Sequence, residues 1–421
     1  MRIQRFGHAG LEVTDLAAAE AFYRRTFGFE VVDRYPEDGE ILLGVGRGDH
    51  LLLHSRAAEG PRAGAIHHVA FELVEGHRQL RDVRQFLERA GIGYEEEDHY
   101  GDAALYFRDP DGNLLEVYAA PGSTPRFADG AERVAAARRF LYAEARPLER
   151  ALYEHGWERA PAERVLAALD AYRNADGGFG HALEPDVRSP ASQPLHTLTA
   201  LELLREAGIR APELADGCCR FLAAVAREDA AVPALRPGAF DWPTAAHWQG
   251  DFAFEPSLSW TYGLAAQLHW HGASHPWFEA ARDACLAALE RPVAGDAHGL
   301  LYRFRFAATL LDGERRRREL KRLRQALDRA AFFVRDAPVA EYGLTPLHFA
   351  PAPDDPAAAC FDAARLDAHV DDLLDAQQGD GGWPIRFEPP SDAARLEWRG
   401  RWTLEALGTL AAYGRLPLNA T

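Results

Sequence analysis

The stretch Phe6–Val32, "FGHAGLEVTDLAAAEAFYRRTFGFEVV", decides the fold of the first part of the chain. Residues Phe6–Val13 alternate between apolar and polar like a strand, and Asp15–Phe27 has the periodicity of a helix. A second strand-like run at Ala65–Leu73, which contains "IHHVAFEL", begins the same order of elements again. The pattern of residues 1–120 therefore predicts a β-α-β-β-β module that occurs twice in succession. The further expected elements are strands at Glu30–Arg34, Ile41–Val45 and Asp49–His54, then a helix at Gly76–Ala90 and strands near Tyr94–Glu97, Ala103–Arg108 and Asn113–Tyr118.

Three polar residues, His8, His68 and Glu116, fall at matching points of the two copies. Side chains alternate between the two faces of a strand, and by this parity all three can point into one cavity. His67 has the opposite parity, so we expect a structural role for it. Two imidazoles and one carboxylate suit a divalent ion of the Fe, Mn, Zn, Ni or Co type. The alternative is three unrelated polar residues at strand positions.

The two copies resemble the vicinal oxygen chelate superfamily, which includes glyoxalases, bleomycin-resistance proteins and extradiol dioxygenases. The resemblance is carried by Phe6–Val32, by "IHHVAFEL" and by "YFRDPDGNLLEVY" at Tyr106–Tyr118. It implies a metal held by the first-strand histidine, the fifth-strand histidine and the last-strand glutamate, which match His8, His68 and Glu116.

Glyoxalase I-like members of that superfamily take a further carboxylate from the fourth strand. The spacing from His68 to Glu116 places the matching slot of the first copy near residues 52–56, where no Asp or Glu occurs. This departure favours a site with three ligands. His50 and His54 share the parity of Leu52, so either can be a fourth ligand, a proton-transfer group or a solvated edge-strand histidine. We take His54 as a candidate catalytic residue.

The length of 421 residues fits two domains. The linker is expected at residues 121–126, "PGSTPR", and separates a domain at 1–120 from one at 127–421. In the second domain the sequence predicts almost only helices. These are Ala131–Gly156, Ala162–Arg173, Leu195–Ala207, Pro212–Ala226, Ser259–His271, Trp277–Leu289, Leu300–Leu311, Arg316–Val334, Ala363–Gln377 and Thr403–Tyr413.

Two segments of the helical domain are related, "NADGGFG" at Asn174–Gly180 and "QGDGGWP" at Gln378–Pro384. Each follows a helix and precedes another, which is the pattern of repeated helix pairs. The domain resembles the squalene cyclase and protein prenyltransferase repeat superfamily, which implies an all-α (α/α) toroid. The Asp-x-Asp-Asp acid of the cyclases and the zinc set of the prenyltransferases are both missing from the sequence.

A polar group follows the first of these turns, in "GHALEPDVRSP". It contains His181, Glu184, Asp186 and Arg188. We expect Glu184 and Asp186 to line the main pocket of the helical domain and to act as acid or base groups. The alternative is that the two carboxylates cap helices and pair with Arg188.

The net charge of −17 argues against a nucleic-acid partner and against binding to anionic membranes. No apolar run reaches the length of a membrane span, and a strand starts at residue 3, so we expect a protein of the cytoplasm without a signal peptide. Oligomers remain possible.

The first hypothesis is a metal-dependent lyase, isomerase or dioxygenase that acts on a small oxygen-bearing substrate, with a helical domain that binds an apolar molecule or partner. The alternatives are a non-catalytic or antibiotic-resistance protein that sequesters an apolar ligand, and an isoprenoid-handling cyclase-like protein.

Overall fold

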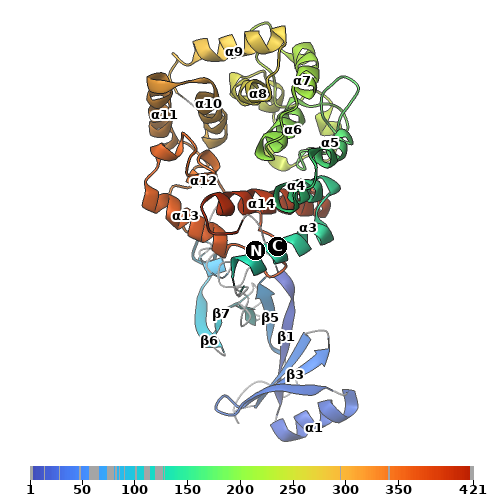
Figure 1. Ribbon diagram of the computed structural model, residues 1–421. Coiled ribbons are helices and arrows are strands. Elements are labelled where there is room, and N and C mark those ends of the chain that lie inside the picture. Colours follow the sequence, from blue (N-terminus) through green and yellow to red (C-terminus); the bar gives the residue numbers. More distant parts are fainter. Residues whose placement is uncertain are drawn as a thin grey trace. The chain divides into compact units, whose positions relative to one another are not determined.

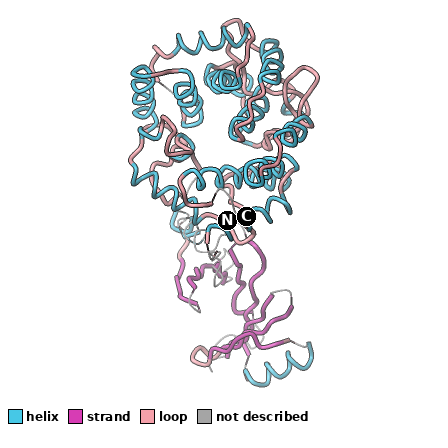
Figure 2. The backbone as a smooth tube through the Cα atoms, viewed as in Figure 1, coloured by secondary structure: helices cyan, strands magenta, loops and turns pink. Residues whose placement is uncertain are grey.

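The computed structural model describes residues 3–417, except 14, 28, 47–48, 56–65, 74–79, 81–82, 85, 90, 100–101, 109–113, 119–126, 128, 294 and 340–341. The chain divides into two compact units, Met1–Arg126 and Phe127–Thr421. Every described strand belongs to the first unit, and the second is built from helices and loops (Figure 2). The expected linker at 121–126 lies outside the described residues.

The first unit contains one eight-stranded sheet with the strand order β2-β3-β4-β1-β5-β8-β7-β6 (Figure 1). Within each half, the first strand is parallel to the last, β1 to β4 and β5 to β8, and β1 joins the halves by pairing antiparallel with β5. The predicted duplication is therefore confirmed by the pairing. The elements are β1 Ile3–Val13, α1 Leu16–Phe27, β2 Glu30–Tyr35, β3 Glu40–Gly46, β4 Asp49–Ser55, β5 Ile66–Leu73, β6 Tyr94–His99, β7 Asp102–Arg108 and β8 Leu114–Tyr118.

One face of each half of the sheet packs against helical residues. Ile41, Leu43 and Leu53 form a buried cluster that also touches residues of α1. In the second half, Leu73, Leu105 and Val117 pack against Leu80, Val83 and Leu87, with Phe71 beside them. Since alternate strand residues face opposite ways, the other face of the sheet carries the even-numbered side chains of β1 and β5.

The described residues of the second unit form helices joined by loops, and the helices follow one another around a common centre (Figure 1). No described helix is long and apolar enough to cross a membrane. The helices are α3 Gly130–Glu144, α4 Pro147–Glu158, α5 Ala162–Asp170, α6 Pro194–Glu206, α7 Pro212–Val225, α8 Leu258–His271, α9 Pro276–Ala288, α10 Ala297–Leu310, α11 Gly313–Leu327, α12 Pro346–Phe349, α13 Ala363–Asp375 and α14 Asp392–Ala412.

Three helix predictions are wrong, one by an internal break and two at an end. The expected single helix over 131–156 is two helices, because Pro147 starts α4 and the preceding Arg146 is extended (φ −65°, ψ 160°). Helix α11 stops at Leu327 rather than near 334, and α14 begins at Asp392, capped by Ser391, rather than near 403.

The two related turns have the same hydrogen bonds, so the internal repeat is present in the structure. The Asp176 carboxylate accepts the amide of Gly178, and Asp380 accepts that of Gly382. The next amides, of Phe179 and Trp383, donate to a threonine hydroxyl of the following helix, Thr197 or Thr403. Gly177 and Gly381 have φ values of 90° and 94°, which favour glycine.

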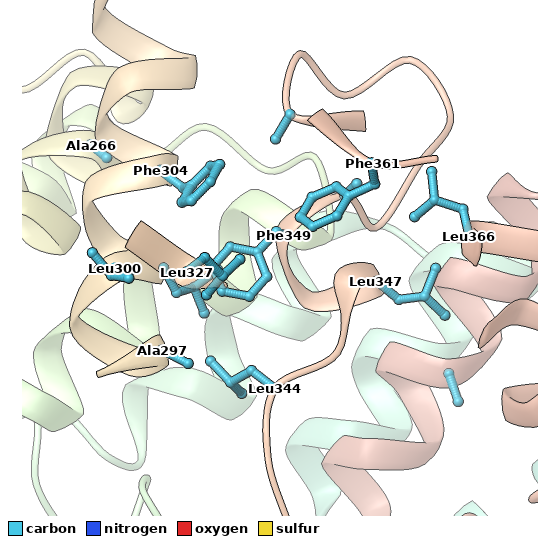
Figure 3. Close-up of a cluster of buried hydrophobic side chains, with 14 of the residues drawn as sticks. Ala266, Ala297, Leu300, Phe304, Leu327, Leu344, Leu347, Phe349, Phe361 and Leu366 are labelled. Carbon is cyan, nitrogen blue, oxygen red and sulfur yellow. The ribbon is translucent and has the colours of Figure 1, made fainter. Parts of the chain in front are cut away.

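Aliphatic and aromatic side chains from different elements form a buried cluster in the second unit (Figure 3). Phe304 of α10 meets Phe349 of α12 edge to face, with ring centroids 5.0 Å apart, and Phe349 in turn contacts Phe361 at 6.1 Å. All three side chains are buried. This packing fixes α10 and α12, which also contribute residues to the cavity described below.

Candidate metal centre

His8, His68 and Glu116 come together on three adjacent strands. In the sheet His8 of β1 lies opposite Ala70 of β5, and Ala70 lies opposite Glu116 of β8. The Nε2 atoms of the two histidines are 2.8 Å apart. The Glu116 Oε2 atom lies 2.9 Å from Nε2 of His68 and 3.4 Å from Nε2 of His8. All three side chains are buried, at 8%, 2% and 1% exposure.

The three atoms form a nearly equilateral triangle, and this shape fits a metal ion. Ligands at right angles around an ion with bonds of about 2.1 Å are separated by about 3 Å. The observed separations of 2.8, 2.9 and 3.4 Å match such a face. The three residues form a group suited to a metal in the part of the chain that the structure describes. Two imidazoles and a carboxylate are also the donor set of non-haem Fe(II) sites.

Two tyrosines and a glycine pack around this triad. The Tyr106 ring lies edge-on to His68 at 6.0 Å, and burial together with the neighbouring Glu116 raises the pKa of Tyr106. Tyr118 contacts the ring of His8 at 5.9 Å. Any side chain at Gly10 would meet His68 Cε1 and His54 Nε2, each at 3.0 Å, so glycine leaves room for both imidazoles.

The place of a fourth ligand is taken by a leucine. Glu116 lies opposite Ala70, two residues beyond His68, and in the first copy Leu52 lies opposite Gly10, two residues beyond His8. Leu52 is fully buried and has no donor atom. The sequence prediction that no carboxylate occupies this slot agrees with the register.

His54 lies beside the triad and is held by a buried carboxylate. Its Nδ1 atom is 2.6 Å from Oε1 of Glu40, which lies opposite it on β3. The His54 ring meets the His68 ring edge to face at 5.6 Å. His50 lies opposite His8 in the register between β1 and β4. The side chain of His67 and residue 56 fall outside the described part of the structure.

Sequence reasoning missed Glu40 and Tyr106 as members of the site. Glu40 can be found by pairing β3 with β4 as a hairpin, because that register places it against His54. Tyr106 stands opposite Glu116 in the same way between β7 and β8. The usable signal was therefore strand pairing, added to the parity along each strand.

The helical unit contains a cavity of about 540 Å³ between α4, α6, α10, α12, α13 and α14. Its wall carries charged and aromatic side chains. They include Glu202, Arg205, Glu206, Arg305, Tyr342, His348, Arg386, Phe387, Arg401, Trp402 and Glu405.

The expectation that Glu184 and Asp186 line this cavity is wrong. Both are buried, at 7% and 3% exposure, but the cavity wall next to Glu184 is Arg401, whose Nη1 lies 3.7 Å from Glu184 Oε2. Burial raises the pKa of Glu184 to about 7, although Arg401 opposes this shift. The reason is local: residues 181–188 form an irregular loop, in which no periodicity tells which way a side chain points.

The other two ionisable residues of that loop, Arg188 and His181, interact with residues outside the loop. Arg188 pairs with Glu397 and not with Glu184 or Asp186. His181 is exposed, and its Nε2 atom bonds to the side chain of Asn174. The Asp186 carboxylate instead accepts a hydrogen bond from the indole of Trp398 and lies 3.1 Å from His247.

Residues 5–117 match the model of the Glyoxalase/Bleomycin resistance protein/Dioxygenase superfamily. Metapyrocatechase 2 of Cupriavidus necator is 34% identical over 184 residues, which are 42% of this chain and 52% of the relative. The chain thus spans about half the length of that curated relative.

Two solved structures are similar to the same share of the chain. Methylmalonyl-CoA epimerase from Mycobacterium tuberculosis is 21% identical, with a TM-score of 0.25, and the match covers 28% of this chain and 90% of the epimerase. A catechol 2,3-dioxygenase is 24% identical, with a TM-score of 0.24, over 28% of this chain and 42% of that chain. By its family match and its duplicated sheet, the segment 5–117 is a domain of the Glyoxalase/Bleomycin resistance protein/Dioxygenase superfamily.

Proposed function

We propose that the first unit is a ring-cleaving dioxygenase site that holds Fe(II) with His8, His68 and Glu116. The observation that carries this proposal is the triangle of two imidazole nitrogens and one carboxylate oxygen, with Leu52 in the place of a fourth ligand. Three protein ligands leave open positions for a substrate. The 34% identity with Metapyrocatechase 2, whose name refers to pyrocatechol, supports an aromatic substrate with two neighbouring hydroxyl groups.

A bound Fe(II) would supply Lewis acidity toward the two substrate oxygens and reactivity toward dioxygen. The protein supplies the proton transfer. His54 is oriented through its Nδ1 by Glu40, and we assign to its imidazole the removal of a proton from a substrate hydroxyl. The Tyr106 phenol, kept protonated by burial, holds Glu116 in place.

We further propose that the second unit is an α/α toroid of the cyclase and prenyltransferase type and that its cavity binds a small molecule with an apolar part. The two matching turns at Asp176 and Asp380 support a repeated helix pair. The aromatic side chains of the cavity wall support an apolar ligand.

Oxygen uptake tests the proposed reaction. Protein loaded anaerobically with Fe(II) is mixed with catechol in air-saturated buffer, and dioxygen consumption and product absorbance are recorded. We expect one dioxygen per catechol, and a loss of about 100-fold or more in kcat for His54→Gln at unchanged iron content. A protein that binds iron but consumes no dioxygen with catechol or substituted catechols contradicts the dioxygenase assignment and leaves a lyase or isomerase reaction.

A further inference from the structure

The helical unit contains a cluster of titratable side chains, and its first pair is Asp186 with His247. The buried Asp186 carboxylate accepts a hydrogen bond from Trp398 Nε1 at 2.8 Å on one oxygen. Its other oxygen lies 3.1 Å from Nε2 of His247, whose side chain is 51% exposed. A buried carboxylate on one nitrogen fixes the orientation of the ring. His247 is therefore an oriented imidazole with its remaining nitrogen accessible.

The second pair is His298 with Tyr342. The Tyr342 hydroxyl lies 2.9 Å from Nε2 of His298, and the two rings stack at 5.9 Å. Partial desolvation, with the nearby Asp186, Glu184 and Asp296, raises the pKa of Tyr342 to about 12, although the residue is still 42% exposed. Burial also lowers the pKa of His298. At neutral pH this pair therefore presents a protonated phenol beside an uncharged imidazole.

Phe387, a residue of the cavity wall, contacts one ring of each pair. Its ring meets the His247 ring edge-on at 6.3 Å and the Tyr342 ring at 5.5 Å. Phe387 and Tyr342 both belong to the cavity wall, together with Trp402. The phenol thus belongs to the wall of a space large enough for a small organic molecule, and the base packs against the Phe387 ring of that wall.

The same cavity wall offers a cation for an anionic substrate group. The Arg205 guanidinium donates to Thr309 Oγ1 at 3.0 Å and to Gln267 Oε1 at 3.5 Å, and both of these partners are uncharged. Among the described residues, no carboxylate forms an ion pair with Arg205. Burial lowers the pKa of Arg205 and Arg305 adds to the effect, while the carboxylates of Asp355, Glu202 and Glu206 act against it.

We propose that the helical unit holds a second active site, in which His247 and Tyr342 move protons on an enolisable carbonyl compound with an aromatic body and a carboxylate. The two pairs contain no serine, threonine or cysteine that could act as a nucleophile. They therefore offer a base and a hydrogen-bond donor. His247 removes a proton from the carbon next to the carbonyl group, and the electron pair moves to the carbonyl oxygen.

Tyr342 then donates its proton to this oxygen, which gives the enol, and the imidazolium of His247 returns a proton to the phenolate through His298 or water. Keto and enol forms are isomers, so no oxidant or reductant enters, and the same groups catalyse the reverse direction. Asp186 acts as a positioning residue for His247.

Phenylpyruvate is the probe for this proposal, because it combines an aromatic ring, an enolisable keto group and a carboxylate. The interconversion of its keto and enol forms is followed by ultraviolet absorbance with the full chain, without oxygen and with EDTA, so that the metal centre cannot contribute. We expect the wild-type protein to accelerate the interconversion over buffer, with a rate that saturates with substrate. This rate should fall by about 100-fold in His247→Ala and should also be lower in Tyr342→Phe.

Three further measurements separate catalysis from a structural role. Added imidazole should restore part of the rate of His247→Ala. Asp186→Asn should lower kcat with little change in KM. The matched control is His269→Ala, an exposed histidine of α8 that should keep the wild-type rate.

The proposal is overturned if wild-type protein does not accelerate the interconversion, or if His247→Ala retains the wild-type rate. A loss of rate in His247→Ala that imidazole does not restore, together with a lowered melting temperature, also overturns it. The activity should persist in His68→Ala protein, so this test and the dioxygenase test can fail independently.

Discussion

Leu52 occupies, opposite Gly10, the register position that Glu116 occupies opposite Ala70. The two halves of the sheet are thus equivalent in backbone pairing but differ in chemistry at this point. One half contributes a carboxylate, and the other contributes a fully buried apolar side chain. The candidate centre therefore offers three protein ligands, and its fourth strand supplies His54, which pairs with Glu40 of β3.

Restoring a carboxylate at this position should make stability depend on metal. In Leu52→Glu without metal, a buried carboxylate lacks a partner and is expected to lower the free energy of unfolding by several kcal/mol. A bound divalent ion should recover most of this loss. Thermal unfolding with EDTA and with excess Mn²⁺ measures both values, and Leu52→Met is the uncharged control. Equal melting temperatures for metal-free Leu52→Glu and wild type would mean that the new side chain lies in solvent, which contradicts the prediction.

Removing the carboxylate behind His54 should reduce turnover without loss of metal. In Glu40→Gln the amide cannot stabilise a charged imidazole, so we expect kcat for catechol to fall by about 10-fold to 100-fold. The iron content should stay at the wild-type level, because Glu40 is not a ligand. Glu37→Gln, an exposed residue in the turn before β3, is the matched control. An unchanged kcat in Glu40→Gln would remove His54 from the reaction.

The two glycines of the repeated turns should be intolerant of a side chain. A Cβ atom at Gly177 would lie 2.3 Å from the carbonyl oxygen of Gly217, and one at Gly381 would lie 2.1 Å from that of Ala136. Gly177→Ala and Gly381→Ala should each cost about 3 kcal/mol or more, because strain at positive φ adds to a clash with backbone.

Gly208→Ala is the control for this comparison, since Gly208 also has positive φ (72°) but a Cβ there meets nothing within 4 Å. It should cost only about 1 kcal/mol. Chemical unfolding followed by far-ultraviolet circular dichroism gives the three values. Similar losses of stability at all three glycines would mean that backbone strain alone, and not the close approach of the neighbouring helix, accounts for the need for glycine in the turns.

The buried Glu184 should make stability fall as pH rises. Its pKa is about 7 in the folded protein and near 4.5 when unfolded, so the folded state binds more protons between these values. The stabilising effect of its proton is complete below pH 4.5 and is lost as pH rises through 7. Glu184→Gln, which imitates the protonated form, should gain stability over wild type between pH 5 and pH 8, by up to about 3 kcal/mol. A difference between the two proteins that does not change with pH contradicts this account.

The sequence predicted the sheet and its triad well, because both follow from the period of two along a strand. His8, His68 and Glu116 needed only parity and the matching of two copies. Glu40 required the pairing of β3 with β4, which parity within one strand does not give.

In the helical unit, periodicity located the helices but not their ends, which Pro147 and the cap at Ser391 determine. The orientation of Glu184 and Asp186 could not be predicted, because residues 181–188 are irregular and long-range contacts with α14 decide where those carboxylates point.

The most direct test of the central claim is the metal content of the protein purified without added metal. Inductively coupled plasma mass spectrometry should find about one divalent ion per chain in the wild type, and little in His8→Ala, His68→Ala and Glu116→Ala, each confirmed as folded by circular dichroism. The account is contradicted if His68→Ala retains the full metal content while His67→Ala loses it, or if wild-type protein binds no ion even after incubation with Fe(II), Mn²⁺ or Zn²⁺.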